Sequence, residues 1–186
     1  MELTFQQIKQ MTVGALGIDQ DDEGIYFTRF TAEQRAAFGA VFAMWAIRCD
    51  FTSGIRIDFH TDATDFTAAV AECGCYEVLV DDLLTYCESL EKGECIQIAL
   101  DGCDHRITLV LPNLTCGKIK SIRLDGESYI RPHSYSKKVA FYGDSITQGS
   151  TAAKSSQSYT WLLTRYFDWH SMNFGVGAFV FSRRPL

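Results

Sequence analysis

Between residues 24 and 131 the sequence repeats one pattern, in which short runs rich in β-branched and aromatic residues are bounded by Gly, Asp or Asn. Residues 55–59 alternate between apolar and polar side chains, and residues 107–111 are almost continuously apolar. Runs of this kind at near-regular spacing predict the strands of a β-sandwich. The predicted strands are residues 24–30, 54–60, 66–72, 76–80, 95–100, 106–111 and 119–124.

One segment of this region has two interpretations. Thr31 followed by Glu33 and Gln34 is typical of a helix start, and an alanine-rich run to Trp45 can continue the helix. Residues 41–47 are apolar enough to form a buried strand instead. Both alternatives stay open on the sequence alone.

The strand-like sequence pattern ends at residues 131–136. This is a short polar stretch in which Pro132 interrupts any strand pattern and the hydroxyl side chains favour turns. We therefore expect a boundary here, with a sandwich domain over residues 1–133 and a different unit over residues 134–186. The chain as a whole is predicted to be mainly β.

The last fifty residues predict strand, helix and strand in that order. Residues 138–142 and 171–174 are the strands, and residues 156–167 form an amphipathic helix between them. The inner side of that helix is expected to carry Tyr159, Leu162, Leu163 and Tyr166. Such a βαβ unit has parallel strands and begins an α/β domain, but one crossover helix leaves most of the sheet uncovered.

The first of these strands leads into Gly143-Asp144-Ser145. A turn after a buried strand places the Ser145 hydroxyl at the carboxyl end of the sheet, where open α/β sheets have their active sites. Gly143 permits a tight turn with unusual backbone angles, and Gly149 lets the next loop approach a substrate. A serine here can attack a carbonyl if a histidine takes its proton. Gly-Asp-Ser is also a common turn sequence, and alone it is more often structural than catalytic.

Two further segments strengthen the catalytic interpretation. Ile146-Thr147-Gln148-Gly149 follows the serine, and Asn173-Phe174-Gly175-Val176-Gly177-Ala178 ends the next strand. Together with Gly143-Asp144-Ser145 they resemble the SGNH, or GDSL, family of serine esterases, whose catalytic domain has a flavodoxin-like α/β fold. The resemblance implies that Ser145 is the nucleophile.

The same resemblance implies an oxyanion hole made of backbone N–H groups. Ser145 supplies one donor, and the last glycine of the family's Asn-x-Gly-x-x-Gly block supplies another. That glycine is Ala178 here, with Gly177 as the alternative register. An alanine keeps the amide donor in place.

The family's third and fifth blocks, which supply an asparagine and an Asp-x-x-His pair, have no match before Leu186. None of His60, His105, His133 and His170 matches the catalytic histidine. We therefore expect an incomplete SGNH unit, with Ser145 as a nucleophile without a base, and a chain that is inactive or nearly so by itself.

The earlier strands are similar to those of two-domain carbohydrate esterases, in which a jelly-roll domain precedes the SGNH domain. Residues 54–62, 76–82 and 109–113 carry this weaker likeness. It implies an acyl esterase that removes acetyl groups from carbohydrate, with no cofactor. The alternative is a carbohydrate-binding or interaction sandwich without catalysis, in which Tyr76, Tyr86 and Tyr129 would stack on sugars or lie in the core. A third hypothesis is a short chain that self-associates through its unfinished sheet edge.

Charge, hydropathy and cysteine content exclude several classes of partner and site. The formal net charge is −6 with no clustered Lys and Arg, which argues against nucleic acid. No membrane-spanning run or signal peptide is evident, so we expect a cytoplasmic protein. Seven cysteines without an export signal favour reduced thiols, and Cys73-Gly-Cys75 lacks the usual zinc spacing, so no metal is expected.

Overall fold

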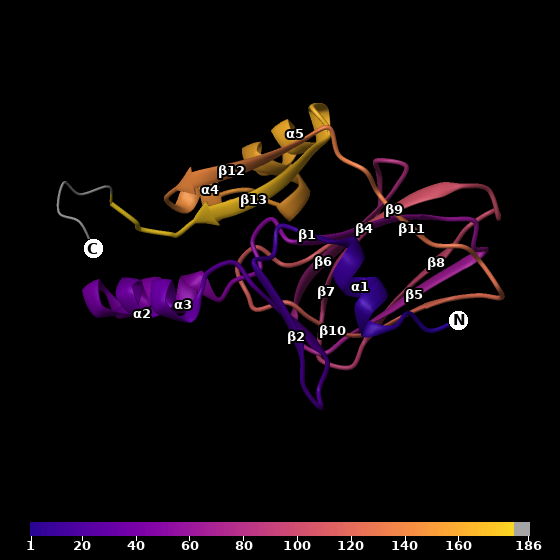
Figure 1. Ribbon diagram of the computed structural model, residues 1–186, viewed down its shortest axis with the longest axis horizontal. Helices are drawn as coiled ribbons and strands as arrows, with labels where there is room; N and C mark the ends of the chain where they lie inside the picture. Colours follow the sequence, from indigo (N-terminus) through magenta and orange to yellow (C-terminus); the bar gives the residue numbers. More distant parts are fainter. Residues whose placement is uncertain (181–186) are drawn as a thin grey trace.

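The computed structural model describes residues 1–180 and consists mainly of strands, arranged in two antiparallel sheets and one parallel pair (Figure 1). The first sheet runs in the order β1 (Thr12–Val13), β4 (Arg56–Thr61), β9 (His105–Val110), β6 (Gly74–Val80) and β7 (Leu83–Leu90), with β11 (Arg131–Pro132) paired to β4. The second runs in the order β2 (Gly17–Gln20), β3 (Ile25–Thr28), β10 (Lys118–Leu124), β5 (Asp65–Val70) and β8 (Cys95–Ala99). All seven predicted strands are present, as β3, β4, β5, β6, β8, β9 and β10.

The main hydrophobic core lies between the two antiparallel sheets. Side chains from both sheets form one buried cluster, in which the rings of Phe59 on β4 and Phe66 on β5 lie 6.3 Å apart between centroids. Helix α1 (Phe5–Met11) adds Ile8 and Met11 to the same cluster. The two sheets therefore pack as a β-sandwich, because each buries one apolar face against the other.

The segment with two interpretations is helical, but it forms two helices. Helix α2 (Ala32–Val41) begins at Thr31, whose side chain forms a capping box with Gln34, as predicted. Phe42 then adopts extended backbone angles and separates α2 from α3 (Ala43–Cys49). The alternative of a strand over residues 41–47 is wrong, because i to i−4 hydrogen bonds resume directly after Phe42.

The C-terminal residues form the predicted strand–helix–strand unit. Strands β12 (Lys137–Gly143) and β13 (Trp169–Gly175) are parallel and in register from Lys137 opposite Trp169 to Gly143 opposite Gly175. Between them lie α4 (Ser145–Gln148), the 3-10 helix η1 (Ser155–Gln157) and α5 (Tyr159–Tyr166). The parallel pairing predicted from the sequence is thus present.

The face that α5 buries differs from the prediction. Leu162 is 52% exposed and Tyr166 81% exposed, and Tyr159 and Leu163 are exposed as well, whereas Thr160, Trp161 and Thr164 are buried. Trp161 packs on Leu79 and Val110 of the six-stranded sheet. The prediction was wrong because α5 turns its threonine and tryptophan side toward the sandwich. On its other side Tyr159 contacts Phe141 of β12 and Thr147 of α4, while Leu162 and Tyr166 stay in solvent.

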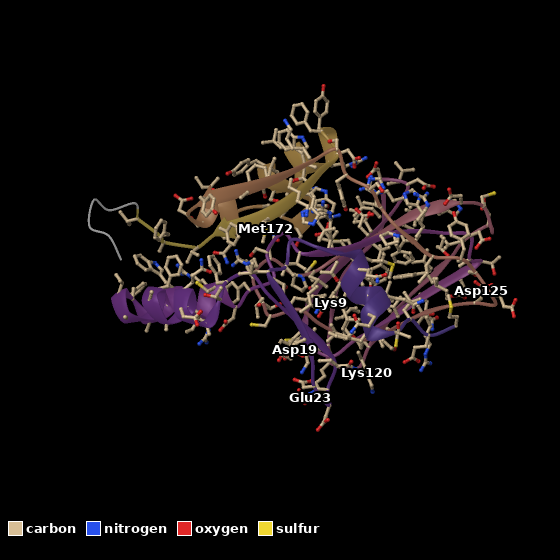
Figure 2. All side chains as sticks on the ribbon, in the orientation of Figure 1. Lys9, Asp19, Glu23, Lys120, Asp125 and Met172 are labelled. Atoms are coloured by element: carbon tan, nitrogen blue, oxygen red, sulfur yellow. The ribbon has the colours of Figure 1, made fainter. Side chains whose placement is uncertain are left out.

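The C-terminal unit forms a third layer over the outer face of the six-stranded sheet. Side chains fill the space between this unit and the sandwich, near Met172 of β13, whereas Glu23 lies at the far end of the sandwich (Figure 2). The strand alternation of β4 puts Ile57 and Phe59 in the main core and points Arg56 and Asp58 to this outer face. The polar face is buried too, because the third layer covers it.

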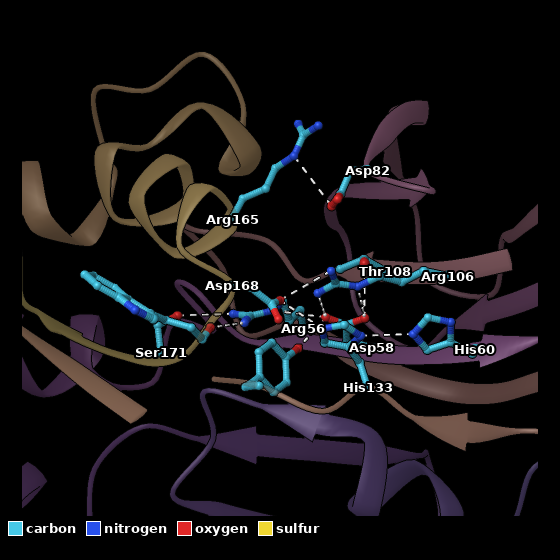
Figure 3. Close-up of polar contacts among 12 residues, drawn as sticks. Arg56, Asp58, His60, Asp82, Arg106, Thr108, His133, Arg165, Asp168 and Ser171 are labelled. Carbon is cyan, nitrogen blue, oxygen red and sulfur yellow. Dashed lines mark hydrogen bonds and ion pairs between the residues drawn. The ribbon is translucent and has the colours of Figure 1, made fainter. Parts of the chain in front are cut away.

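Charged side chains of the outer face meet at this junction (Figure 3), and Arg56 and Asp58 are buried there. Asp58 accepts two hydrogen bonds from Arg106, at 2.9 and 2.7 Å, and one from the hydroxyl of Tyr135. Arg56 donates to the carbonyl of Trp169 at 3.0 Å, on β13. Burial alone would raise the pKa of Asp58, but the hydrogen bonds and charge of Arg106 outweigh it and hold that pKa below its ordinary value.

The polar stretch at residues 131–136 also contributes to the junction. Arg131 and Pro132 form the short strand β11 beside His60 and Phe59 of β4, where a loop was predicted. A proline is tolerated there because an edge strand need not donate from every residue.

Replacing Asp58 with asparagine should lower the free energy of unfolding by about 3 kcal/mol at pH 7, because Arg56 would stay buried without its ion-pair partner and Arg106 would keep only the longer of its two ion pairs, with Asp168. The folded-state pKa of Asp58 is depressed, so its contribution is present above the unfolded pKa and is lost as the pH falls through the folded pKa. Urea denaturation of the unaltered protein and the variant, at pH values from neutral down through the folded-state pKa of Asp58, measures the difference in the free energy of unfolding.

Asp22→Asn is the matched control, since Asp22 is exposed and forms no hydrogen bond or ion pair within residues 1–180. Its effect should stay within about 0.5 kcal/mol. Equal stabilities of the Asp58 and Asp22 variants at neutral pH would contradict the assigned role of Asp58.

Candidate active site

Ser145 lies two residues beyond the end of β12 and begins α4. Asp144 caps this helix, because its Oδ1 accepts a hydrogen bond from the Ile146 N–H at 2.9 Å. A Cβ on Gly143 would lie 2.0 Å from Oγ1 of Thr147, so the turn needs glycine there for space rather than for its backbone angles. The Ser145 side chain is half-buried, and its hydroxyl has no hydrogen-bond partner within residues 1–180.

Glycine is required after α4 for a different reason, namely its backbone angles. Gly149 adopts a left-handed φ of +90° as the C-cap, and its N–H donates to the carbonyl of Ser145 at 3.0 Å. A Cβ there would also lie 2.7 Å from the side-chain nitrogen of Asn113. Gly149 therefore ends the short helix and lets it pack against the sandwich.

The second predicted segment meets the first at the same edge of the parallel sheet. Gly175 pairs with Gly143, and the Val176 N–H donates to the Gly143 carbonyl at 3.0 Å. The side chain of Asn173 donates to the Thr147 carbonyl at 2.8 Å and accepts from the Gly175 N–H at 2.9 Å. Asn173 thus fixes the end of β13 to α4.

The backbone donors at this edge differ in how they are used. The Gly177 N–H donates to Oε1 of the buried Gln148 at 2.6 Å, whereas the N–H groups of Ser145 and Ala178 have no acceptor within residues 1–180. Ala178 is exposed and has a φ of +62°. Two donors are therefore free to bind an anionic oxygen. The role of Gln148 was not predicted, because nothing in the sequence pairs it with Gly177.

The histidines of the C-terminal unit lie at the other end of the sheet. His170 pairs with Lys138 and lies five residues before Gly175, on the order of 16 Å from the carboxyl end of β13. His133 precedes β12, and its Nε2 lies 2.8 Å from a carboxylate oxygen of Asp168, which precedes β13.

The other two histidines belong to the sandwich. His60 Nε2 lies 3.0 Å from Nδ1 of His133, and His105 lies between Asp81 and Asp101, whose hydrogen bonds raise its pKa. All four histidines are within the described residues, and none of their hydrogen bonds reaches Ser145. None of them is placed to take its proton.

A pocket of about 120 Å³ lies between the loop after β9 and the loop after α4. It is lined by Cys75, Pro112, Asn113, Gly149, Lys154 and Ser155, among others. Asn113 is nine-tenths buried, and its side-chain amide has no hydrogen-bond partner within residues 1–180. The pocket can therefore hold a small polar group one helical turn away from Ser145.

Residues 1–180 contain neither a metal-binding group of side chains nor a membrane-spanning helix. Over that range no three His, Cys, Asp or Glu side chains are grouped to hold a metal ion. No helix there combines the length and apolarity needed to span a membrane.

No family model and no curated protein matches the sequence. Among solved structures, the chain is similar to the salicylyl-acyltransferase SsfX3 from a tetracycline biosynthetic pathway, with a TM-score of 0.75 and 23% identity over 90% of this chain and 52% of that chain. It is also similar to a putative GDSL-like lipase from Bacteroides ovatus, with a TM-score of 0.65 and 18% identity over 95% and 56%.

A third similar structure is a family two carbohydrate esterase from Clostridium thermocellum in complex with cellohexaose, with a TM-score of 0.60 and 14% identity over 88% and 50%. The likeness is one of fold. The chain spans about half the length of each of these proteins, which are esterases, lipase-like proteins and acyltransferases.

Replacing Ala178 with glycine should raise the free energy of unfolding by about 1 kcal/mol, because an L-residue with a Cβ is strained at a positive φ. Urea denaturation measures this change. The control is Ala153→Gly, at an exposed position without a positive φ, where the added chain entropy of glycine should slightly destabilise the protein. A loss of stability in the Ala178 variant that equals the control would contradict the strain.

Proposed function

We propose that this chain is the nucleophile-bearing part of a serine acyl esterase that works through an acyl-Ser145 intermediate. The observation that carries the proposal is the free Ser145 hydroxyl at the carboxyl end of β12, at the sheet edge where β13 also ends and leads into Ala178, whose N–H is unpaired within residues 1–180. The similar folds of esterases and an acyltransferase support it.

The roles follow from the chemistry of acyl transfer. Ser145 attacks the ester carbonyl, and the N–H groups of Ser145 and Ala178 donate to the oxygen that becomes negative. Ala178 fits this role better than Gly177, whose N–H is already bonded to Gln148. Gly143, Asp144 and Gly149 shape the turn. In this proposal residues 1–133 are a jelly-roll-like domain and residues 134–186 are the first part of an SGNH domain.

The general base is proposed to be a histidine outside this chain, since its own four histidines lie elsewhere. Without a base, a serine hydroxyl is a weak nucleophile at neutral pH, and general bases contribute roughly 10² to 10⁴ in rate. The 186 residues alone should therefore hydrolyse esters slowly or not at all.

The proposed substrate is an acetylated carbohydrate, as the fold shared with carbohydrate esterases suggests. No cofactor is needed for this chemistry, and a cytoplasmic location remains our prediction. The likeness to SsfX3 favours a second candidate, transfer of the acyl group from Ser145 to an acceptor hydroxyl instead of water. Both reactions share the acyl-Ser145 intermediate.

A carbohydrate-binding role for the sandwich alone is a weaker proposal. Tyr76 is fully buried and Tyr86 is half-buried, which leaves the 39%-exposed Tyr129 as the best candidate for stacking on a sugar. Self-association through the free edge of β12 is a further proposal, and the exposed Tyr142 on β12 and Leu162 on α5 favour it.

An activated ester together with imidazole tests the nucleophile. With p-nitrophenyl acetate we expect imidazole, acting as an added base, to accelerate acetylation of Ser145, detected by mass spectrometry of the peptide that contains it. Ser145→Ala should abolish this signal, and Ser134 in the same protein serves as an internal control. Acetylation of Ser145 no faster than that of Ser134 would contradict the nucleophile assignment.

The same experiment without imidazole tests the missing base. We expect the unaltered chain and the Ser145→Ala variant to hydrolyse p-nitrophenyl acetate at the same rate. Rapid turnover by the unaided chain would show that a base within these 186 residues reaches Ser145.

A further inference from the structure

Arg29 follows β3 in the sandwich and is almost fully buried, with 1% of its surface exposed. It has no ion-pair partner within residues 1–180. Burial lowers its pKa to about 10, so the guanidinium is charged at neutral pH. A buried charge without a counter-ion is unfavourable unless its donors are satisfied, and the contacts of Arg29 therefore need a reason.

All the hydrogen bonds of Arg29 go to backbone carbonyls, in two groups. Nε donates to Phe51 at 2.6 Å and Nη2 to Arg48 at 2.7 Å, both in the segment that ends α3. Nη1 donates to Asn173 at 2.7 Å and to Gly175 at 2.9 Å, at the end of β13. One rigid guanidinium thus joins the N-terminal region to the strand that leads into Ala178.

The position of these bonds along β13 decides what they fix. β13 is paired with β12 on one side only, and Arg29 supplies hydrogen-bond donors to two of its other carbonyls. Both backbone polar groups of Gly175 are then hydrogen-bonded: its N–H donates to the Asn173 side chain, and its carbonyl accepts from Arg29. Only Val176 and Gly177 separate this fixed point from the Ala178 N–H.

Packing around the same point comes from the N-terminal region as well. Val176 is buried against Phe30, Trp45 and Cys49, all from the segment just after β3. The loop before β4 also touches β13, because a Cβ on Gly54 would lie 2.8 Å from Cβ of Asn173. The Arg48 side chain also approaches this loop, since a Cβ on Gly177 would lie 3.1 Å from its Nη1. Within residues 1–180, however, Arg29 is the charged side chain that donates hydrogen bonds to residues 173–178, and such bonds are directional.

We propose that Arg29 is a positioning residue that sets the conformation of residues 175–178, so that the sandwich region shapes the oxyanion-binding loop and is not a separable module. The catalytic meaning of this inference rests on the proposed esterase function. The structural claim does not, because it concerns the backbone of the loop only.

Hydrogen exchange of individual amides, followed by NMR on the full chain, tests the claim. In Arg29→Met we expect the protection of the Val176 and Gly177 amides to fall about tenfold or more, since hydrogen bonds from a charged group are lost. Protection of Ile107 and Leu109 in β9 should change by less than about threefold, because local opening does not require global unfolding.

Two variants complete the experiment. Arg29→Lys keeps the charge but not the fork of donors, so it should give an intermediate loss at the same two amides. Arg35→Met removes an exposed ion pair with Asp50 in the same region and should leave Val176 and Gly177 unchanged.

The outcomes separate the two proposals. A uniform loss of protection, unchanged amides at 176 and 177, or failure of both Arg29 variants to fold would make Arg29 a general stability residue and overturn the inference. Local loosening without any acetyl-Ser145 in the imidazole experiment would overturn the esterase proposal and leave the positioning role of Arg29 intact. Slower acetylation of Ser145 in Arg29→Lys, with an unchanged melting temperature, would support both the positioning role of Arg29 and the esterase proposal.

Discussion

The buried charge cluster around Asp58 sets the relation between the sandwich and the C-terminal unit. Asp58 and Arg56 lie on the outer face of β4, and strand alternation forces them there once Ile57 and Phe59 enter the core. Charged groups on a sheet face either remain in water or are covered by a layer that supplies partners. Here Tyr135 and the Trp169 carbonyl supply those partners, so the third layer packs in one orientation.

That orientation has consequences at the opposite end of the parallel sheet. The register of β12 and β13 aligns Gly143 with Gly175, which brings the Ser145 turn and the loop that contains Ala178 to one edge. Close approach of backbones, with no room for a Cβ on Gly143 or Gly175, keeps α4 against both strands. The serine is therefore held in place by packing, while its hydroxyl stays free.

The histidines of the C-terminal unit lie away from Ser145. His133 and His170 lie near the amino ends of β12 and β13, where the strands meet the sandwich, and they belong to the junction. In a parallel sheet the amino and carboxyl ends are a strand length apart, so no side-chain rotation brings either ring to Ser145. Within residues 1–180, the carboxyl edge of the parallel sheet therefore has the unpaired N–H groups of Ser145 and Ala178 but no histidine beside Ser145.

The sequence by itself determined the strands of the sandwich, the cap at Thr31, the parallel βαβ unit and the turn at Ser145, because these depend on local alternation, capping chemistry and chain order. The capping box of Thr4 and Gln7 before α1 is a local pattern of the same kind. Only the tertiary structure decided which side of α5 is buried, where Arg29 and Gln148 donate and accept, and that Gly143 is needed for space. These depend on segments far apart in the chain, and a local pattern carries no information about which surface packs against it.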